Sequence, residues 1–176
     1  VSLYGPKTSK LSNFIIECQQ VLLDELGEIF TPYHTHQVHG TIISFERVND
    51  QSFNNLQIYN QYGDKKPMDI NGYIKHIKNT FNFPIYVRIA GFQKEYSHFL
   101  SRGKPPYYRS FSILGRKIIV IGWPIIDDQS PNEYSQILGK IRSSGKKFNI
   151  LHAYNTNNSV DNEYYFRLGL LDNEKN

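Results

Sequence analysis

Residues 110–123, SFSILGRKIIVIGW, decide the fold class of this chain. Two runs rich in apolar and β-branched residues flank Gly115 and Arg116. A short polar step with a glycine between two such runs is typical of a β-hairpin. The stretch therefore predicts antiparallel strands at residues 110–114 and 117–123.

Similar patterns on either side of this hairpin predict the remaining elements. Short apolar runs predict strands at residues 1–3, 38–45, 84–90, 148–154 and 164–171. Apolar residues at helical spacing predict helices at residues 9–26, 70–81 and 131–145. A run of strands with helices at intervals predicts an α+β fold, in which helices pack on an antiparallel or mixed sheet.

The chain is predicted to be a single domain. Its 176 residues suit one hydrophobic core, and no repeat, low-complexity block or linker divides the sequence. We expect the domain to span residues 1–171, followed by a polar tail at residues 172–176.

Composition narrows the class of partner. The net charge of +4 favours anionic partners such as RNA or nucleotides.

The chain has one cysteine, Cys18, so it cannot form an intramolecular disulfide. Cys18 lies on the apolar side of the first predicted helix. No segment reaches the roughly 18 apolar residues of a membrane span. We expect a cytoplasmic monomer that does not enter a membrane.

The first candidate motif is His39-Gly40-Thr41-Ile42 in the predicted strand 38–45. Residues two apart on a strand project from the same face, so His39 and Thr41 would lie side by side. An imidazole can move a proton while a neighbouring hydroxyl donates a hydrogen bond to a phosphate oxygen. The motif therefore favours phosphate chemistry, although a histidine followed two residues later by serine or threonine is expected about once by chance in a chain of this composition.

The second candidate motif is His152-Ala153-Tyr154-Asn155 in the predicted strand 148–154. His152 and Tyr154 would again share a strand face, and the Tyr154 hydroxyl could contact a phosphate oxygen from a longer side chain. The alternative is a histidine of the core that hydrogen-bonds a neighbour.

Together the two motifs and the order of elements resemble the two-histidine (2H) phosphoesterase superfamily, which includes the RNA 2′,3′-cyclic phosphodiesterases also called 2′-5′ RNA ligases. The family uses His-x-Thr/Ser-x twice. His39-Gly40-Thr41-Ile42 matches it, whereas the second motif has Tyr154 where threonine or serine is usual. The resemblance covers nearly the whole chain in element order and only these motifs in residue identity.

The resemblance implies two pseudo-symmetric lobes with a central cleft. His39 and His152 would act as general base and general acid, and Thr41 and Tyr154 would hold the phosphate oxygens. No metal or cofactor is implied. The expected function is a metal-independent phosphodiesterase acting on a cyclic or 2′-linked phosphodiester of RNA or a small nucleotide. The alternative is a non-catalytic module that binds an RNA end or a cyclic nucleotide with a degenerate second motif.

A basic segment rich in tyrosine, residues 101–109, lies between the motifs. Tyr107 and Tyr108 could stack on bases and Arg109 could bind a phosphate, so these residues are candidates for substrate binding. An ordinary solvated loop explains the same composition equally well.

Two other readings remain open. His34, His36 and His39 could supply three imidazoles to a metal, but on a strand His39 would point away from the other two. The chain could also be an interaction domain in which the histidines have no chemical role.

Overall fold

The strand β4 (Lys117–Ile125) lies at the centre of an open antiparallel sheet with the order β1-β5-β4-β2. The computed structural model describes residues 2–49, 51–63, 65–95, 99–153 and 161–172. β5 (Tyr164–Leu171) pairs with one edge of β4, and β1 (Phe30–Pro32) pairs with β5. β2 (Tyr86–Ile89) and β3 (Phe111–Leu114) pair with the other edge of β4. The register Leu114↔Lys117 confirms the predicted hairpin.

The chain forms two compact units. The sheet unit comprises Val1–Thr41, Val87–Trp123 and Tyr164–Asn176, and the helical unit comprises Ile42–Tyr86 and Pro124–Glu163. That residues 1–171 fold as one domain stays a prediction. Of the expected tail, only Asp172 is among the described residues.

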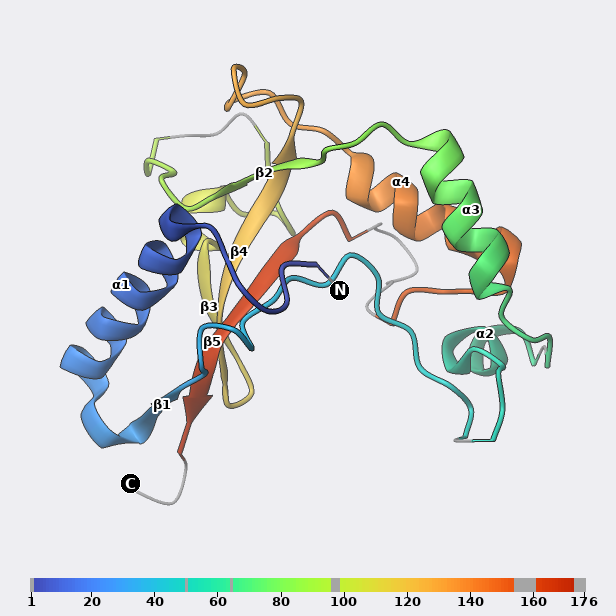
Figure 1. The fold of residues 1–176 in the computed structure, drawn as a ribbon, viewed down its shortest axis with the longest axis horizontal. Coiled ribbons are helices and arrows are strands. Elements are labelled where there is room, and N and C mark those ends of the chain that lie inside the picture. The colour runs from blue at the N-terminus through green and yellow to red at the C-terminus, as the bar shows by residue number, and fades with distance from the viewer. Residues whose placement is uncertain (1, 50, 64, 96–98, 154–160, 173–176) are drawn as a thin grey trace. The chain divides into compact units, whose positions relative to one another are not determined.

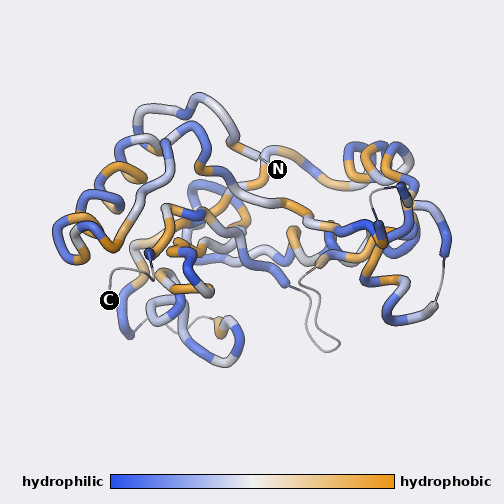
Figure 2. Tube along the Cα trace, turned by 90° about the horizontal axis from the view of Figure 1, so that it is seen from below, coloured by the Kyte–Doolittle hydropathy of each residue, from blue (hydrophilic) through white to orange (hydrophobic). Residues whose placement is uncertain are grey.

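In the sheet unit, α1 (Ser9–Leu26) packs beside β1 and β5 (Figure 1). Hydrophilic and hydrophobic residues alternate along the helix (Figure 2), which buries Ile15 and Leu22. The buried amide of Gln19 donates to the carbonyls of Tyr33 and Leu168, both at 2.8 Å, and so joins the helix to the sheet edge. Two 3₁₀ turns complete this unit, η1 (Gly27–Ile29) and η2 (Pro106–Tyr108).

The helical unit contains α2 (Leu56–Tyr62), α3 (Ile70–Thr80), α4 (Ile137–Ser144) and the 3₁₀ turn η3 (Gly145–Phe148). Met68, Tyr73, Ile141 and Ile150 form its buried core. α3 confirms the helix predicted at 70–81. α4 begins six residues later than the predicted start at residue 131, because the chain before it folds back so that Tyr134 bridges to Ile125.

The prediction of a strand at residues 38–45 is wrong, because the apolar side chains of this run pack in two different units. Val38 is buried in the sheet unit, and Gly40 alone makes strand bridges, to Ser2 and Phe166. From Ile42 onward the chain belongs to the helical unit, where Ile42, Ile43 and Phe45 pack on the core cluster. A run that is continuous in sequence is thus divided in space.

The strand predicted at residues 148–154 is also wrong over its described part. Ile150 is fully buried, but its N–H donates to the carbonyl of Gly145, the first residue of η3. The Leu151 carbonyl accepts from the buried Asn55 side chain, and the Ala153 N–H donates to the Ser44 carbonyl. Because these groups find partners without a strand ladder, the apolar run is an irregular core segment.

Candidate functional site

His39 lies in the sheet unit, half-buried, directly before the bridging residue Gly40. Its Nδ1 is 2.7 Å from the Gln37 carbonyl, which can only accept, so Nδ1 carries a proton. The lone pair of a neutral His39 is therefore on Nε2. The Tyr4 ring meets the imidazole edge-on, with ring centroids 5.7 Å apart. This tautomer suits a group that accepts a proton at Nε2.

The glycine of the motif is required by packing. A Cβ at residue 40 would overlap the ring of Tyr164, which is buried and hydrogen-bonded to the Ser2 hydroxyl. Burial raises the pKa of Tyr164, with the Ser2 hydrogen bond acting in the opposite sense, so the phenol stays protonated at neutral pH. Gly40 therefore lets the histidine segment approach β5 closely.

The bridge between Gly40 and Phe166 sets which residues share a face. Side chains alternate across an antiparallel pair, so His39 and Thr41 fall opposite Arg167 and Tyr165 on the face away from Phe166. Tyr165 and Arg167 are half-buried, whereas Phe166 and Leu168 are fully buried on the other face. We call the set His39, Thr41, Tyr165 and Arg167 the polar face.

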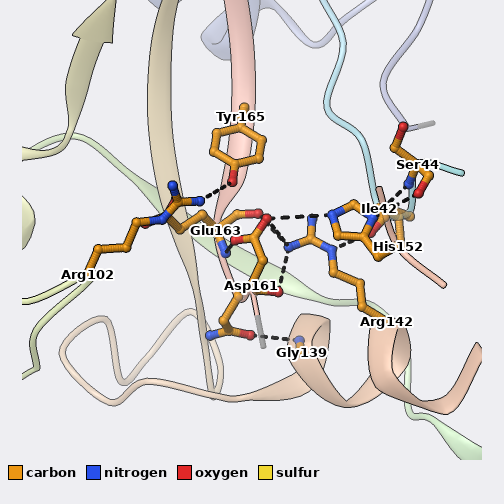
Figure 3. Close-up of polar contacts among 10 residues, drawn as sticks. Ile42, Ser44, Arg102, Gly139, Arg142, His152, Asp161, Glu163 and Tyr165 are labelled. Carbon is orange, nitrogen blue, oxygen red and sulfur yellow. Dashed lines mark hydrogen bonds and ion pairs between the residues drawn. The ribbon is translucent and has the colours of Figure 1, made fainter. Parts of the chain in front are cut away.

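Arg102 extends the polar face from a tight turn. Its Nη2 donates to the Tyr165 hydroxyl at 3.3 Å (Figure 3). Ser101 and Lys104 exchange backbone hydrogen bonds around Arg102 and Gly103, whose φ angles are 49° and 77°. A positive φ is uncommon for a residue other than glycine, so the turn holds the Arg102 backbone in a sparsely populated conformation next to Tyr165.

The three predicted substrate-binding residues lie in and after η2 of the same unit. Tyr107 and Tyr108 are 48% and 53% exposed, and their rings meet edge-on with centroids 5.2 Å apart. Arg109 is half-buried and its Nη1 donates to the Ser101 carbonyl at 3.5 Å.

His152 has a different environment, in the helical unit. Only 2% of its surface is exposed. Its Nδ1 lies 2.9 Å from the Ser44 nitrogen and 3.1 Å from the Ser44 carbonyl oxygen, and its Nε2 lies 3.6 Å from Asp161 Oδ2 (Figure 3). Tyr154, its predicted partner, lies outside the described residues.

Arg142 contacts the same carboxylate oxygen of Asp161 as His152 does. The side chain is 2% exposed, and its Nη1 is 3.4 Å from Asp161 Oδ2. Nη1 also donates to the carbonyls of Asp161 and Glu163, and Nε donates to the carbonyl of Ile42. The charge of Arg142 is therefore balanced by Asp161 and by three carbonyl groups, as a buried ion requires.

Sequence reasoning gave no role to Arg142, Asp161 or Tyr165. Arg142 and Asp161 carried no signal, because a charged residue on a helix and one in a polar loop are both usually exposed. Tyr165 and Arg167 did carry a signal, because they alternate with Tyr164, Phe166 and Leu168 along the strand and therefore lie on its other face.

The sequence offers His34, His36 and His39 as candidate ligands of a metal ion. No group of three or more histidine, cysteine, aspartate or glutamate side chains in the described part of the chain could hold an ion. The rings of His34 and His36 do meet, with centroids 5.2 Å apart, but the His34 Nδ1 accepts a hydrogen bond from the His36 N–H.

Comparison with known proteins leaves the site to be argued from its own geometry. No protein-family model, no curated protein and no solved structure matches this chain. Within the described residues, no helix is long and apolar enough to cross a membrane.

Proposed function

We propose that the polar face binds a phosphate group of RNA or of a small nucleotide, and that His39 transfers a proton during metal-independent cleavage of a phosphodiester. The observation that carries the proposal is the fixed tautomer of His39, which directs the Nε2 lone pair away from Gln37 on the face that also holds Arg167. A proton acceptor beside a guanidinium suits attack on an anionic phosphate.

Each residue of the polar face has a role in this proposal. His39 Nε2 takes the proton of the attacking water as its oxygen bonds to phosphorus. Arg167 and the Thr41 hydroxyl contact the non-bridging oxygens, whose charge grows in the transition state. No hydrogen bond or ion pair joins the Arg167 guanidinium to another described residue, so no described group competes with a phosphate for it.

The leaving oxygen needs a proton from a second group. In the two-histidine form, with its two pseudo-symmetric lobes and cleft, that group is His152. The Tyr165 hydroxyl is the better candidate within the described sheet unit, since it lies on the polar face and is contacted by Arg102. His152 is buried and has neighbours at both ring nitrogens, which favours a structural role for it.

The test is hydrolysis of a 2′,3′-cyclic nucleotide and of 2′,5′-linked RNA in excess EDTA. His39→Ala should lower kcat by about 10²–10⁴-fold, the usual worth of a general base. His34→Ala is the matched control, an exposed histidine in the same segment, and should retain full activity. Loss of activity in EDTA together with loss in His34→Ala would support a metal site instead and would overturn the proposal.

Binding without turnover is the second candidate, favoured by the burial of His152. In that case the wild-type protein binds the cyclic nucleotide, Arg167→Ala binds it poorly, and neither releases product. Tyr165→Phe separates the candidates, because removing the hydroxyl should lower turnover and leave binding of the nucleotide largely intact.

A further inference from the structure

Two exposed tyrosines belong to the 3₁₀ turn η2 of the sheet unit. Pro106, the first residue of η2, is fully buried, and its carbonyl accepts from the N–H of Arg109 and from the hydroxyl of Ser110. Tyr107 and Tyr108, by contrast, leave about half of their surface in solvent. A turn anchored in the core therefore presents two aromatic rings that the core itself does not use.

The turn lies near the polar face. The Ile121 N–H donates to the Ser110 carbonyl at 2.9 Å, and Ile121 is the register partner of Tyr165. Ser110 is therefore two strand spacings from Tyr165, about 10 Å, because neighbouring strands lie about 4.8 Å apart. That span matches about three stacked base steps of roughly 3.4 Å each.

Positive charge follows the same path. Arg102 contacts the Tyr165 hydroxyl, and Arg109 reaches back from η2 to the Ser101 carbonyl of the Arg102 turn. Lys104 closes that turn and is exposed. The polar face, the Arg102 turn and η2 thus place cationic and aromatic groups in the same unit.

We infer that the ligand is a single-stranded oligonucleotide, with one phosphate on the polar face and a base a few nucleotides away stacked on Tyr107 or Tyr108. The inference rests on the proposed function. Cationic groups that follow a backbone, with aromatic rings for the bases, are the common means of binding single strands. A mononucleotide held on the polar face would not reach the tyrosines.

The experiment measures the affinity of RNA one to six nucleotides long, ending in a 3′-phosphate and therefore without a cyclic diester. Calorimetry should show that affinity rises with length and then levels off near the length that spans the path. Tyr107→Ala with Tyr108→Ala should weaken binding of the hexamer about 5- to 150-fold, the usual effect of losing one stacked base, and leave the mononucleotide unchanged.

Two controls test the cause of this loss. Tyr62→Ala removes a tyrosine of matching exposure, 47%, from the helical unit and should not affect binding. Tyr107→Phe with Tyr108→Phe keeps both rings, so it should bind as the wild type does and shows that the protein folds with changes at these sites.

The two proposals fail in different ways. Equal affinity for the mononucleotide and the hexamer, or a hexamer affinity unaffected by the double alanine change, overturns the oligonucleotide inference alone, provided that Arg167→Ala still weakens mononucleotide binding. If the wild type binds no RNA of any length, both proposals are wrong.

Discussion

The two histidine motifs occupy opposite environments. His39 in the sheet unit is half-buried and has one ring nitrogen fixed by a carbonyl. His152 in the helical unit is 2% exposed and has neighbours at both nitrogens. Similar patterns, a histidine within an apolar run, thus give a group that can meet a ligand in one unit and a group that holds core segments together in the other.

The largest expected effect is in the helical unit. Arg142→Ala leaves the Asp161 carboxylate buried without its main counter-charge, so we expect a loss of about 3–5 kcal/mol in unfolding free energy. Urea unfolding followed by far-UV circular dichroism measures it. Lys140→Ala, an exposed site on the same helix, is the control and should change stability by less than about 0.5 kcal/mol.

The fluorescence of Trp123 lets the same experiment follow the sheet unit separately, because this residue is the only tryptophan of the chain and belongs to that unit. If Arg142→Ala shifts its fluorescence transition by as much as the dichroism transition, the two units unfold together, as predicted for a single domain. A variant as stable as the wild type would show that the network is not needed for folding.

The next effect is in the sheet unit. Gly40→Ala places a Cβ in the ring of Tyr164, which is held by Ser2 and packed edge-on against Phe166. Overpacking of this kind costs about 1–3 kcal/mol. The Trp123 fluorescence transition should report it, and Tyr164→Leu in the same chain should recover part of the loss. If the double variant regains no stability, the loss comes from the backbone of residue 40 and not from the contact with Tyr164.

A smaller, pH-dependent effect concerns Tyr73. Burial raises its pKa to about 12 from an ordinary value near 10, with a hydrogen bond from Ser144 and the charge of Arg142 acting in the opposite sense. Between about pH 10 and pH 12, the native state therefore keeps the phenol proton of Tyr73 while the unfolded state loses it. The stability that this provides is complete below about pH 10 and is lost as pH rises toward 12.

Tyr73→Phe removes this titration. At neutral pH it should cost about 0.5–1.5 kcal/mol, the worth of the hydrogen bond to the Ile141 carbonyl. Urea midpoints measured between pH 8 and 11 should then fall less steeply than in the wild type. Parallel slopes for the two proteins would contradict the prediction.

The smallest expected effect is at His39. Because its side chain makes one local hydrogen bond to Gln37, His39→Ala should change the unfolding free energy by less than about 0.5 kcal/mol. His152→Ala should cost far more, since it opens a cavity and removes a neighbour of Asp161. Equal losses in urea unfolding would remove the distinction between the two histidines.

The local apolar pattern predicted a helix or strand correctly where that element packs in a single core. The strand β5 and the helices α1 and α3 each follow an apolar periodicity that matches one buried face, and β4 is an apolar run that is buried almost throughout. Residues 38–45 and the described residues 148–153 are also largely apolar and do not form strands. The first run is divided between two units, and the second hydrogen-bonds to Asn55 and Ser44 in place of a neighbouring strand.

The sequence by itself determined that a mixed α+β fold forms, because this follows from local periodicity. Only the tertiary structure decided that His39 shares a face with Arg167 and that His152 is buried beside Asp161 and Arg142. Strand register and core burial depend on residues more than 100 positions apart, such as Gly40 with Phe166 and Ser44 with His152 at a separation of 108. No local pattern carries that information.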